Sequence, residues 1–192
     1  MLKGKKIIIT GAASGIGRAT AVLAAEEGAD IAIADIDRQG AEETAELVKA
    51  RGQDSLVIEM DTSLVADAKR MVKDTVARFG TIDGIVCGAI KLRPAKLEDL
   101  ELEDWDMVIN IGLKGYFLCA QAAGKLMLEN GNGSIVFLSS VGGVQPYNGA
   151  GAYSIAKAGT LMMGNLFGVE WGDRGVRANT VVPGQVRTPM TC

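Results

Sequence analysis

The fold is decided by the stretch Thr10-Gly11-Ala12-Ala13-Ser14-Gly15-Ile16-Gly17, which joins an apolar run at 6–10 to a helical pattern that starts at residue 15. Short apolar runs rich in β-branched residues predict buried strands. Glycines at the turn let the backbone change direction sharply between strand and helix. The stretch therefore predicts the first strand–turn–helix unit of an α/β domain.

The same alternation continues along the whole chain. Further strands are predicted at 30–34, 55–60, 82–87, 134–138 and 178–182, and helices at 15–27, 38–50, 64–79, 103–128 and 152–171. Buried apolar strands separated by helices pair in parallel through right-handed crossovers. We predict a doubly wound parallel sheet (a Rossmann fold) with helices on both faces, formed by a single domain at 1–192.

Composition excludes several classes of protein and of site. The 192 residues are 48% hydrophobic and 22% charged, as in ordinary globular domains. A net charge of −3 gives no basic surface for nucleic acid or an anionic membrane, so neither is expected as a partner. The sequence has no histidine, which excludes histidine-based triads and most zinc sites, and no metal is expected.

Cysteine usage and hydropathy predict a soluble, cytoplasmic protein. Cys87, Cys119 and Cys192 are odd in number and far apart, which indicates neither a disulfide framework nor a metal knuckle. The apolar run near the amino terminus is too short for a signal peptide, and no later stretch is long and apolar enough to cross a membrane.

The glycine-rich turn is a candidate dinucleotide site. Its glycines allow the backbone to approach a pyrophosphate, which would face the free N–H groups at the start of the helix. Asp35 ends the second strand, 18 residues after Gly17, where a carboxylate can bind the ribose hydroxyls of NAD. It would repel the 2′-phosphate of NADP, and neither Ser14 nor Ile36 supplies a cation, although Arg38 lies close. The alternative is a plain strand-to-helix turn.

A second candidate site surrounds Tyr153 and Lys157. Their i, i+4 spacing places phenol and ammonium on one helix face, where the cation favours the phenolate and lowers the tyrosine pKa. Lys157 is the one charged residue between positions 131 and 169. Ser139 and Ser140 end the fifth strand, where a hydroxyl could hold a substrate carbonyl oxygen. The alternative is an exposed helix pair.

A third stretch, Pro183-Gly184-Gln185-Val186-Arg187-Thr188-Pro189, follows the last predicted strand. It reads either as an ordinary loop or as a wall of the same ligand site. In the second interpretation, the Val186 N–H and the Thr188 hydroxyl could bind an amide.

Together these segments resemble the short-chain dehydrogenase/reductase family over almost the whole chain. The resemblance implies that Ser140, Tyr153 and Lys157 are catalytic, that Asp61 contacts adenine, and that Thr188 contacts the carboxamide. The cofactor-binding residues that we assign to NAD are Gly11, Ser14, Gly15, Ile16, Gly17, Asp35, Ile36, Asp61, Thr62, Cys87, Gly88, Ala89, Tyr153, Lys157, Pro183, Gly184, Val186 and Thr188.

The chain departs from the family pattern in three places. Where the family usually has Asn-Asn-Ala-Gly, this chain reads Cys87-Gly88-Ala89-Ile90. Gly112 stands at the position of the family's active-site asparagine, and Asn110 falls two residues early. In the family, the main-chain carbonyl of that asparagine supports the lysine through water. Glycine keeps this carbonyl for Lys157 but lacks the side chain. Relatives continue beyond Thr-Pro-Met, so we expect the carboxyl-terminal lid and edge strand to be missing from this sequence.

The resulting functional prediction is an NAD-dependent oxidoreductase that moves a hydride between nicotinamide and a secondary alcohol or ketone. Tyr153 would act as acid or base, with Ser140 holding the substrate oxygen. The alternative is a catalytically silent, dinucleotide-binding regulatory or scaffold protein.

The apolar surface of helices 103–128 and 152–171 predicts a homodimer or homotetramer. The side chains expected on it are Tyr116, Phe117, Met162, Met163, Leu166 and Phe167.

Overall fold

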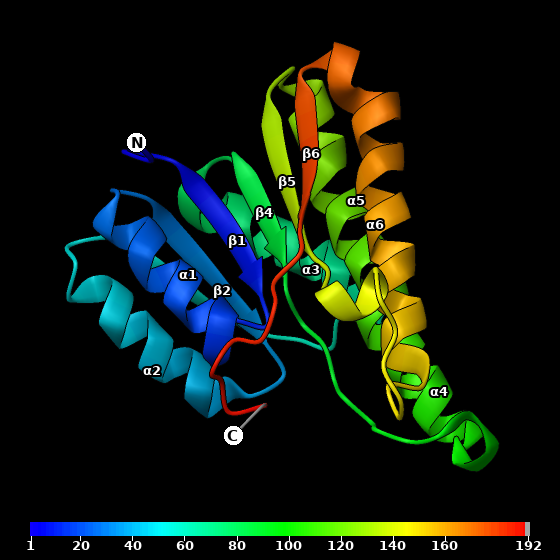
Figure 1. Ribbon diagram of the computed structural model, residues 1–192. Coiled ribbons are helices and arrows are strands. Elements are labelled where there is room, and N and C mark those ends of the chain that lie inside the picture. Colours follow the sequence, from blue (N-terminus) through cyan, green and yellow to red (C-terminus); the bar gives the residue numbers. More distant parts are fainter. Residues whose placement is uncertain (191–192) are drawn as a thin grey trace.

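The protein is a twisted parallel sheet with helices packed on its faces, seen in a computed structural model that describes residues 1–190 (Figure 1). The strands are β1 (Lys6–Thr10), β2 (Asp30–Asp35), β3 (Ser55–Glu59), β4 (Gly84–Cys87), β5 (Gly133–Leu138) and β6 (Val176–Val181). They pair in the order β3-β2-β1-β4-β5-β6, and all pairs are parallel. The predicted α/β Rossmann fold is confirmed.

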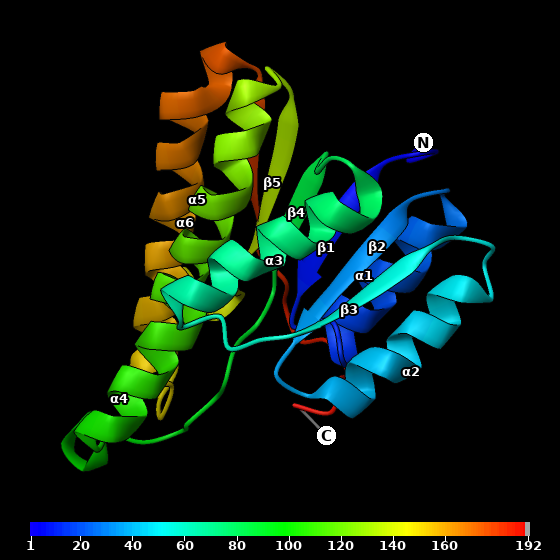
Figure 2. The same cartoon turned by 180° about the vertical axis from the view of Figure 1, so that it is seen from behind.

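The helices form two groups, one on each face of the sheet. Helices α1 (Gly15–Glu26) and α2 (Arg38–Lys49) pack on one face of β1 and β2 (Figure 1). On the other face lie α3 (Val65–Phe79), α5 (Gly115–Glu129) and α6 (Ala152–Trp171) (Figure 2). Helix α4 (Leu102–Ile109) precedes α5 and packs on α6. The chain reverses its winding direction between β1 and β4, which is where sheets of this kind bind ligands.

The sheet is not covered equally on both faces, contrary to the expectation from the sequence. The interior strand β2 is buried at four consecutive residues, whereas in the edge strand β6 every second residue is exposed. Within residues 1–190, helices cover β5 and β6 on one face and leave the other open (Figure 1). Residues of β6 such as Val181 are therefore half exposed.

The helix expected at 103–128 is two helices joined by an irregular turn. Residues Asn110–Lys114 form a π-helical turn between α4 and α5, in which the Gly115 N–H donates to the Asn110 carbonyl. A π turn holds one more residue than an α turn, so it changes which residues of α5 face the core. Other boundaries differ from the prediction by up to two residues, with β4 and β6 each starting two residues away from the expected position.

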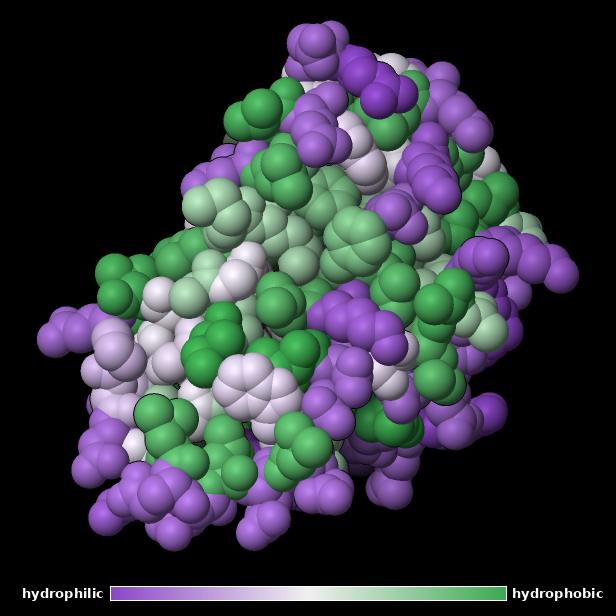
Figure 3. Space-filling model, turned by 90° about the vertical axis from the view of Figure 1, so that its right-hand side faces the viewer, coloured by the Kyte–Doolittle hydropathy of each residue, from purple (hydrophilic) through white to green (hydrophobic). Residues whose placement is uncertain are grey.

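The outer side of α5 and α6 exposes an apolar stripe, although three of the six expected members are not on it. Tyr116 and Phe167 are buried in the core, and Met163 is partly buried and packs against the core. The exposed apolar residues of these helices are Phe117, Ile155, Met162, Leu166 and Val169. On α6 they recur at helical spacing, so they lie on one side, and hydrophobic residues gather across the middle of this face (Figure 3). Cys192 lies outside the described residues.

Candidate active site

A cavity of about 700 Å³ lies at the carboxyl ends of the strands. Its walls come from the segments that follow all six strands, together with the start of α6. Nearly every cofactor and catalytic residue expected from the sequence lines it: Gly11, Ser14, Gly15, Ile16, Gly17, Asp35, Ile36, Asp61, Thr62, Gly88, Ala89, Ser140, Tyr153, Lys157, Pro183, Gly184, Val186 and Thr188. The fold thus brings together residues that are far apart in the sequence.

The glycine turn needs glycine for two steric reasons. Gly11 has a φ of +73°, and a Cβ there would lie 2.7 Å from the Ala89 nitrogen. A Cβ at Gly17 would lie 2.1 Å from the Gly11 carbonyl oxygen, so the first turn of α1 packs directly on the turn before it. These contacts let the main chain itself form the cavity wall.

The amino terminus of α1 is free to receive an anion. Ser14 precedes the helix without a side-chain capping bond, and the first turn has no acidic residue. The N–H groups of a first helical turn have no partner within the helix, and the helix dipole favours negative charge there. Since residues 14–17 line the cavity, a pyrophosphate fits this end.

Asp35 is held in place at the end of β2. Its two carboxylate oxygens accept hydrogen bonds from the Ala13 N–H at 2.9 Å and the Asp37 N–H at 3.0 Å. Each oxygen retains a lone pair, so the carboxylate can still accept from ribose hydroxyls. Arg38, three residues later, is paired with Glu42 at 2.8 Å and Glu59 at 3.6 Å. These ion pairs raise the pKa of Arg38, with Glu42 contributing most.

The segment after β3, where the sequence predicts an adenine contact at Asp61, forms one end of the cavity. Asp61 accepts a hydrogen bond from the Ser63 N–H at 2.8 Å, which fixes the turn. Thr62 is buried and lies against Gly115, where a Cβ would come within 2.9 Å of the threonine hydroxyl oxygen. The start of α5 is therefore in contact with a residue that lines this end of the cavity.

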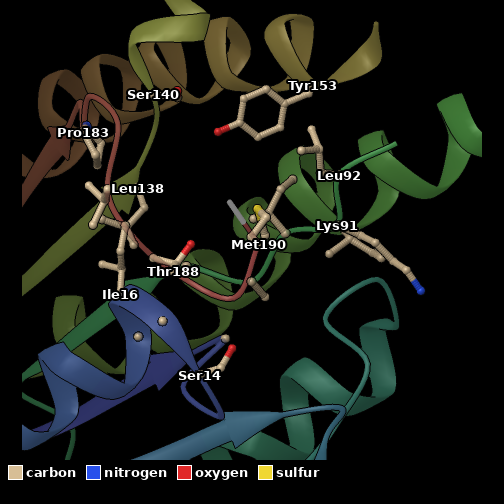
Figure 4. A pocket seen from close by; sticks show the side chains of 18 of the residues that line it. Ser14, Ile16, Lys91, Leu92, Leu138, Ser140, Tyr153, Pro183, Thr188 and Met190 are labelled. Carbon is tan, nitrogen blue, oxygen red and sulfur yellow. The ribbon is translucent and has the colours of Figure 1, made fainter. Parts of the chain in front are cut away.

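Residues 183–190, the last part of the chain that the structure describes, form another wall of the cavity. The Val141 N–H donates to the Pro183 carbonyl at 3.0 Å, which ties this segment to the loop that carries Ser140. Thr188 approaches the glycine turn, since a Cβ at Gly15 would lie 3.5 Å from its side chain. Thr188 and Met190 are seen across the cavity from Tyr153 in Figure 4.

Ser140 and Tyr153 both line the cavity, and both lie close to Gly142. A Cβ built on Gly142 would stand 3.5 Å from the Ser140 Oγ and from Tyr153 Cε1, and 3.0 Å from Tyr147 Cε1. The Ser140 hydroxyl oxygen accepts from the Gly142 N–H at 3.1 Å, which keeps it at the end of β5. The phenol of Tyr153 points into the cavity (Figure 4). The cavity therefore has a hydroxyl and a phenol in its lining.

Lys157 lies behind Tyr153 and is almost completely buried. Its Nζ donates to the Leu138 carbonyl at 2.6 Å and to the Tyr116 hydroxyl at 3.1 Å. It stands 5.8 Å from the centre of the Tyr153 ring, close enough for a cation to act on that phenol. Burial lowers the pKa of Lys157 from 10.5 to about 7.

Cys87, which the sequence assigns to the cofactor, is not among the residues that line the cavity. It is fully buried in the core, and its Sγ lies 3.8 Å from the Tyr116 carbonyl oxygen. Strand alternation explains this, because Gly88 is the residue that meets the cavity. Burial raises the pKa of the Cys87 thiol well above its ordinary value.

Sequence reasoning missed Tyr116, which is the side-chain partner of Lys157. It had been placed on an outer surface because α4 and α5 were taken as one regular helix. Regular helical spacing gave no signal for this position, because the π turn at 110–114 shifts the register of α5.

The comparisons with known proteins agree with this geometry. A family model described as short chain dehydrogenase matches residues 5–192. The (2S)-[(R)-hydroxy(phenyl)methyl]succinyl-CoA dehydrogenase subunit BbsD of Thauera aromatica is 40% identical over 98% of this chain and 76% of its own. The D-threitol dehydrogenase of Mycolicibacterium smegmatis is 39% identical, over 98% and 73% of the two chains.

A solved structure extends the likeness to three dimensions. The carveol dehydrogenase from Mycobacterium avium, crystallised in complex with NAD, superposes with a TM-score of 0.94 at 35% identity. The match covers 98% of this chain and 73% of that one. This chain thus spans about three quarters of the length of these relatives.

Proposed function

The chain belongs to the short-chain dehydrogenase family of oxidoreductases, and from this premise we propose that it transfers a hydride between NAD and a secondary alcohol or ketone. The observation that carries the proposal is the convergence of Ser140, Tyr153 and Lys157 on a cavity whose far end is the glycine turn. The first two both lie next to Gly142, and Lys157 Nζ stands 5.8 Å from the centre of the Tyr153 ring.

The chemistry of the residues follows from their positions. Ser140 holds the substrate oxygen by donating its hydroxyl proton, while Tyr153 removes the proton from an alcohol or returns it to a ketone. Lys157 stabilises the phenolate of Tyr153 by its charge. Alcohol oxidation releases one proton through Tyr153 and one hydride, which the nicotinamide accepts when it is bound.

The cavity fits a dinucleotide in three of its parts. The open amino terminus of α1 suits a pyrophosphate, and Asp35 suits a ribose diol. Arg38 is engaged by two glutamates, which removes the nearest cation that could favour a 2′-phosphate. These features favour NAD over NADP.

The decisive experiment is Tyr153→Phe in the whole chain. We expect turnover of an alcohol panel with NAD to fall by about 10²–10⁴-fold, because the acid–base group is lost. NAD binding measured by calorimetry should persist, since the glycine turn and Asp35 are untouched. Turnover that survives Tyr153→Phe would overturn the proposed mechanism.

The same calorimetry distinguishes the alternative of a silent dinucleotide-binding protein. Gly112, at the position of the family's asparagine, is the observation that favours it. NAD binding without turnover of any alcohol or ketone in the panel, in either direction, would support the alternative.

The substrate side is bordered by Lys91, Leu92, Tyr147 and Met190, which a small-molecule alcohol or ketone would contact. We also propose a homodimer or homotetramer through the apolar stripe of α5 and α6 (Figure 3). The cytoplasmic location stays a prediction from cysteine usage. Among residues 1–190, no helix has the length and apolarity needed to cross a bilayer.

A further inference from the structure

We propose that Tyr116 is a positioning residue that holds Lys157 through its phenolic hydroxyl and thereby supports the acid–base role of Tyr153. The inference deepens the proposed function and rests on it for the role of Tyr153. Tyr116 touches neither the cavity nor the reacting atoms, so it acts through Lys157.

The hydrogen bonds around Lys157 form a closed triangle. Lys157 Nζ donates to the Tyr116 hydroxyl at 3.1 Å and to the Leu138 carbonyl at 2.6 Å, and the Tyr116 hydroxyl donates to the same carbonyl at 3.4 Å. A buried ammonium without acceptors would be costly. The triangle gives the ammonium two acceptors and also satisfies the buried phenol.

The ring of Tyr116 is held independently of its hydroxyl. It is buried and stacks on Phe137 with 6.3 Å between ring centres. Lys157 Nζ also lies 4.9 Å from the centre of the Tyr116 ring. Because packing fixes the ring, the hydroxyl meets Nζ at a set position without an entropy cost at the moment of reaction.

Two of the segments that depart from the family pattern, 87–90 and position 112, are in contact with each other. A Cβ at Gly112 would lie 2.1 Å from Ile90 Cδ1, so the isoleucine side chain fills the space that a side chain at position 112 would need. Ile90 and Gly112 therefore form a complementary pair. Cys87 lies on the far side, with its Sγ 3.8 Å from the Tyr116 carbonyl.

The Thr160 hydroxyl, on α6, lies 3.5 Å from the main-chain carbonyl of Gly112 and donates to the Ala156 carbonyl at 2.9 Å. The π turn at 110–114 sets the register that brings Tyr116 inward. Position 112 therefore offers Lys157 no side chain, and Tyr116, one turn later, provides the polar contact.

The electrostatic consequence concerns Tyr153. The titratable groups that face Lys157 and Tyr116 are Cys87 on β4, Cys119 on α5 and Tyr153 on α6. Within the described part of the chain, no carboxylate forms an ion pair with Lys157. An acceptor on Nζ favours the ammonium, and the ammonium favours the Tyr153 phenolate. Burial raises the pKa of Tyr116 well above its ordinary value, so Tyr116 stays a neutral phenol.

The test is Tyr116→Phe, which removes the hydroxyl and keeps the ring. The sequence has three tyrosines, so ¹³Cζ-tyrosine NMR of the cofactor-free protein resolves Tyr153 directly. We expect the titration midpoint of Lys157, read as the inflection that it causes in the Tyr153 resonance, to fall by about 0.5–1 pH unit from about 7, the size of losing one hydrogen bond to a charged group. The step in the pH profile of kcat/KM for alcohol oxidation that reports the ionisation of Lys157 should move by the same amount in the same direction.

The matched control is Thr75→Val, which also removes a buried hydroxyl bonded to a main-chain carbonyl, here Met71 at 2.7 Å on α3. It should leave the Lys157 inflection and the pH profile unchanged. A Lys157 inflection at the same pH in the wild type and in Tyr116→Phe overturns the proposal. If Tyr116→Phe had no such effect while Tyr153→Phe abolished turnover, the proposed function would stand and only the role of Tyr116 would be refuted.

The wild-type protein provides a second measurement that does not depend on the folding of a variant. Since the Tyr116 hydroxyl accepts from Nζ, its ¹³Cζ resonance should shift with the titration of Lys157, and Lys157→Met should abolish that inflection. A Tyr116 resonance that shows no inflection at the Lys157 midpoint overturns the proposal.

Discussion

The buried ammonium of Lys157 predicts that this residue lowers stability at neutral pH. Folding lowers its pKa from 10.5 to about 7, because burial disfavours the charged form. Between these two pH values the unfolded chain binds more protons than the folded one, so stability rises with pH across this window. Lys157→Met keeps the length of the side chain and removes the ionisable group.

The magnitude follows from the same two values. At about 1.36 kcal/mol per pH unit, burying Lys157 costs at most about 4 kcal/mol at pH 7, a cost that fades towards pH 10.5. Losing the Nζ hydrogen bonds to Leu138 and Tyr116 offsets about 2 kcal/mol of that gain. We therefore expect Lys157→Met to stabilise the cofactor-free protein by about 2 kcal/mol at pH 7 and to lose this advantage by pH 10.

Urea unfolding followed by circular dichroism at pH 7, 8, 9 and 10 measures the effect. Lys125→Met, at an exposed position of α5, is the matched control and should change the free energy of unfolding by less than about 0.5 kcal/mol at every pH. If the difference in unfolding free energy between Lys157→Met and the wild type were the same at pH 7 and pH 10, the argument from burial of the ammonium would be refuted. Turnover with NAD should be lost in the stabilised variant.

Three further predictions concern the cofactor, the assembly and the thiols. Asp35→Ser should raise kcat/KM with NADP relative to NAD by about tenfold or more, since the repulsion of a 2′-phosphate is removed; unchanged preference in steady-state assays would contradict this role. Leu166→Glu should convert the oligomer to a monomer in sedimentation velocity, because it places a charge in the exposed apolar stripe. A wild-type protein that is itself a soluble monomer would exclude the proposed interface. In a Cys192→Ser background, Cys87 and Cys119 should react with a thiol reagent only upon unfolding, because both are buried and burial raises the pKa of Cys119 to about 12; rapid labelling of the folded protein would show that the core opens.

Local rules explain why much of the site could be predicted from the sequence. Gly11 and Gly17 are required by contacts within one strand–turn–helix unit. The i, i+4 spacing places Tyr153 and Lys157 on one face of a helix whatever the rest of the chain does. Asp35 ends a strand next to β1, and neighbouring parallel strands bring their carboxyl ends to one edge of the sheet.

The apolar residues that were misplaced depend on contacts between distant segments. Phe167 was assigned to an outer surface, whereas its ring packs on Phe137 of β5, with 5.5 Å between ring centres. An apolar helix does not reveal by composition which of its sides meets the sheet.

The sequence alone therefore determined the layout of this protein: the strand–helix alternation, the cofactor turn and the Tyr153–Lys157 pair, because each follows from the geometry of a few consecutive residues. Only the tertiary structure decided what surrounds Lys157. The π turn at 110–114 sets the register of α5, and the sheet then brings Tyr116 and Leu138 to Nζ from 41 and 19 residues away. Such contacts depend on how whole helices and strands pack against one another, which no local periodicity specifies.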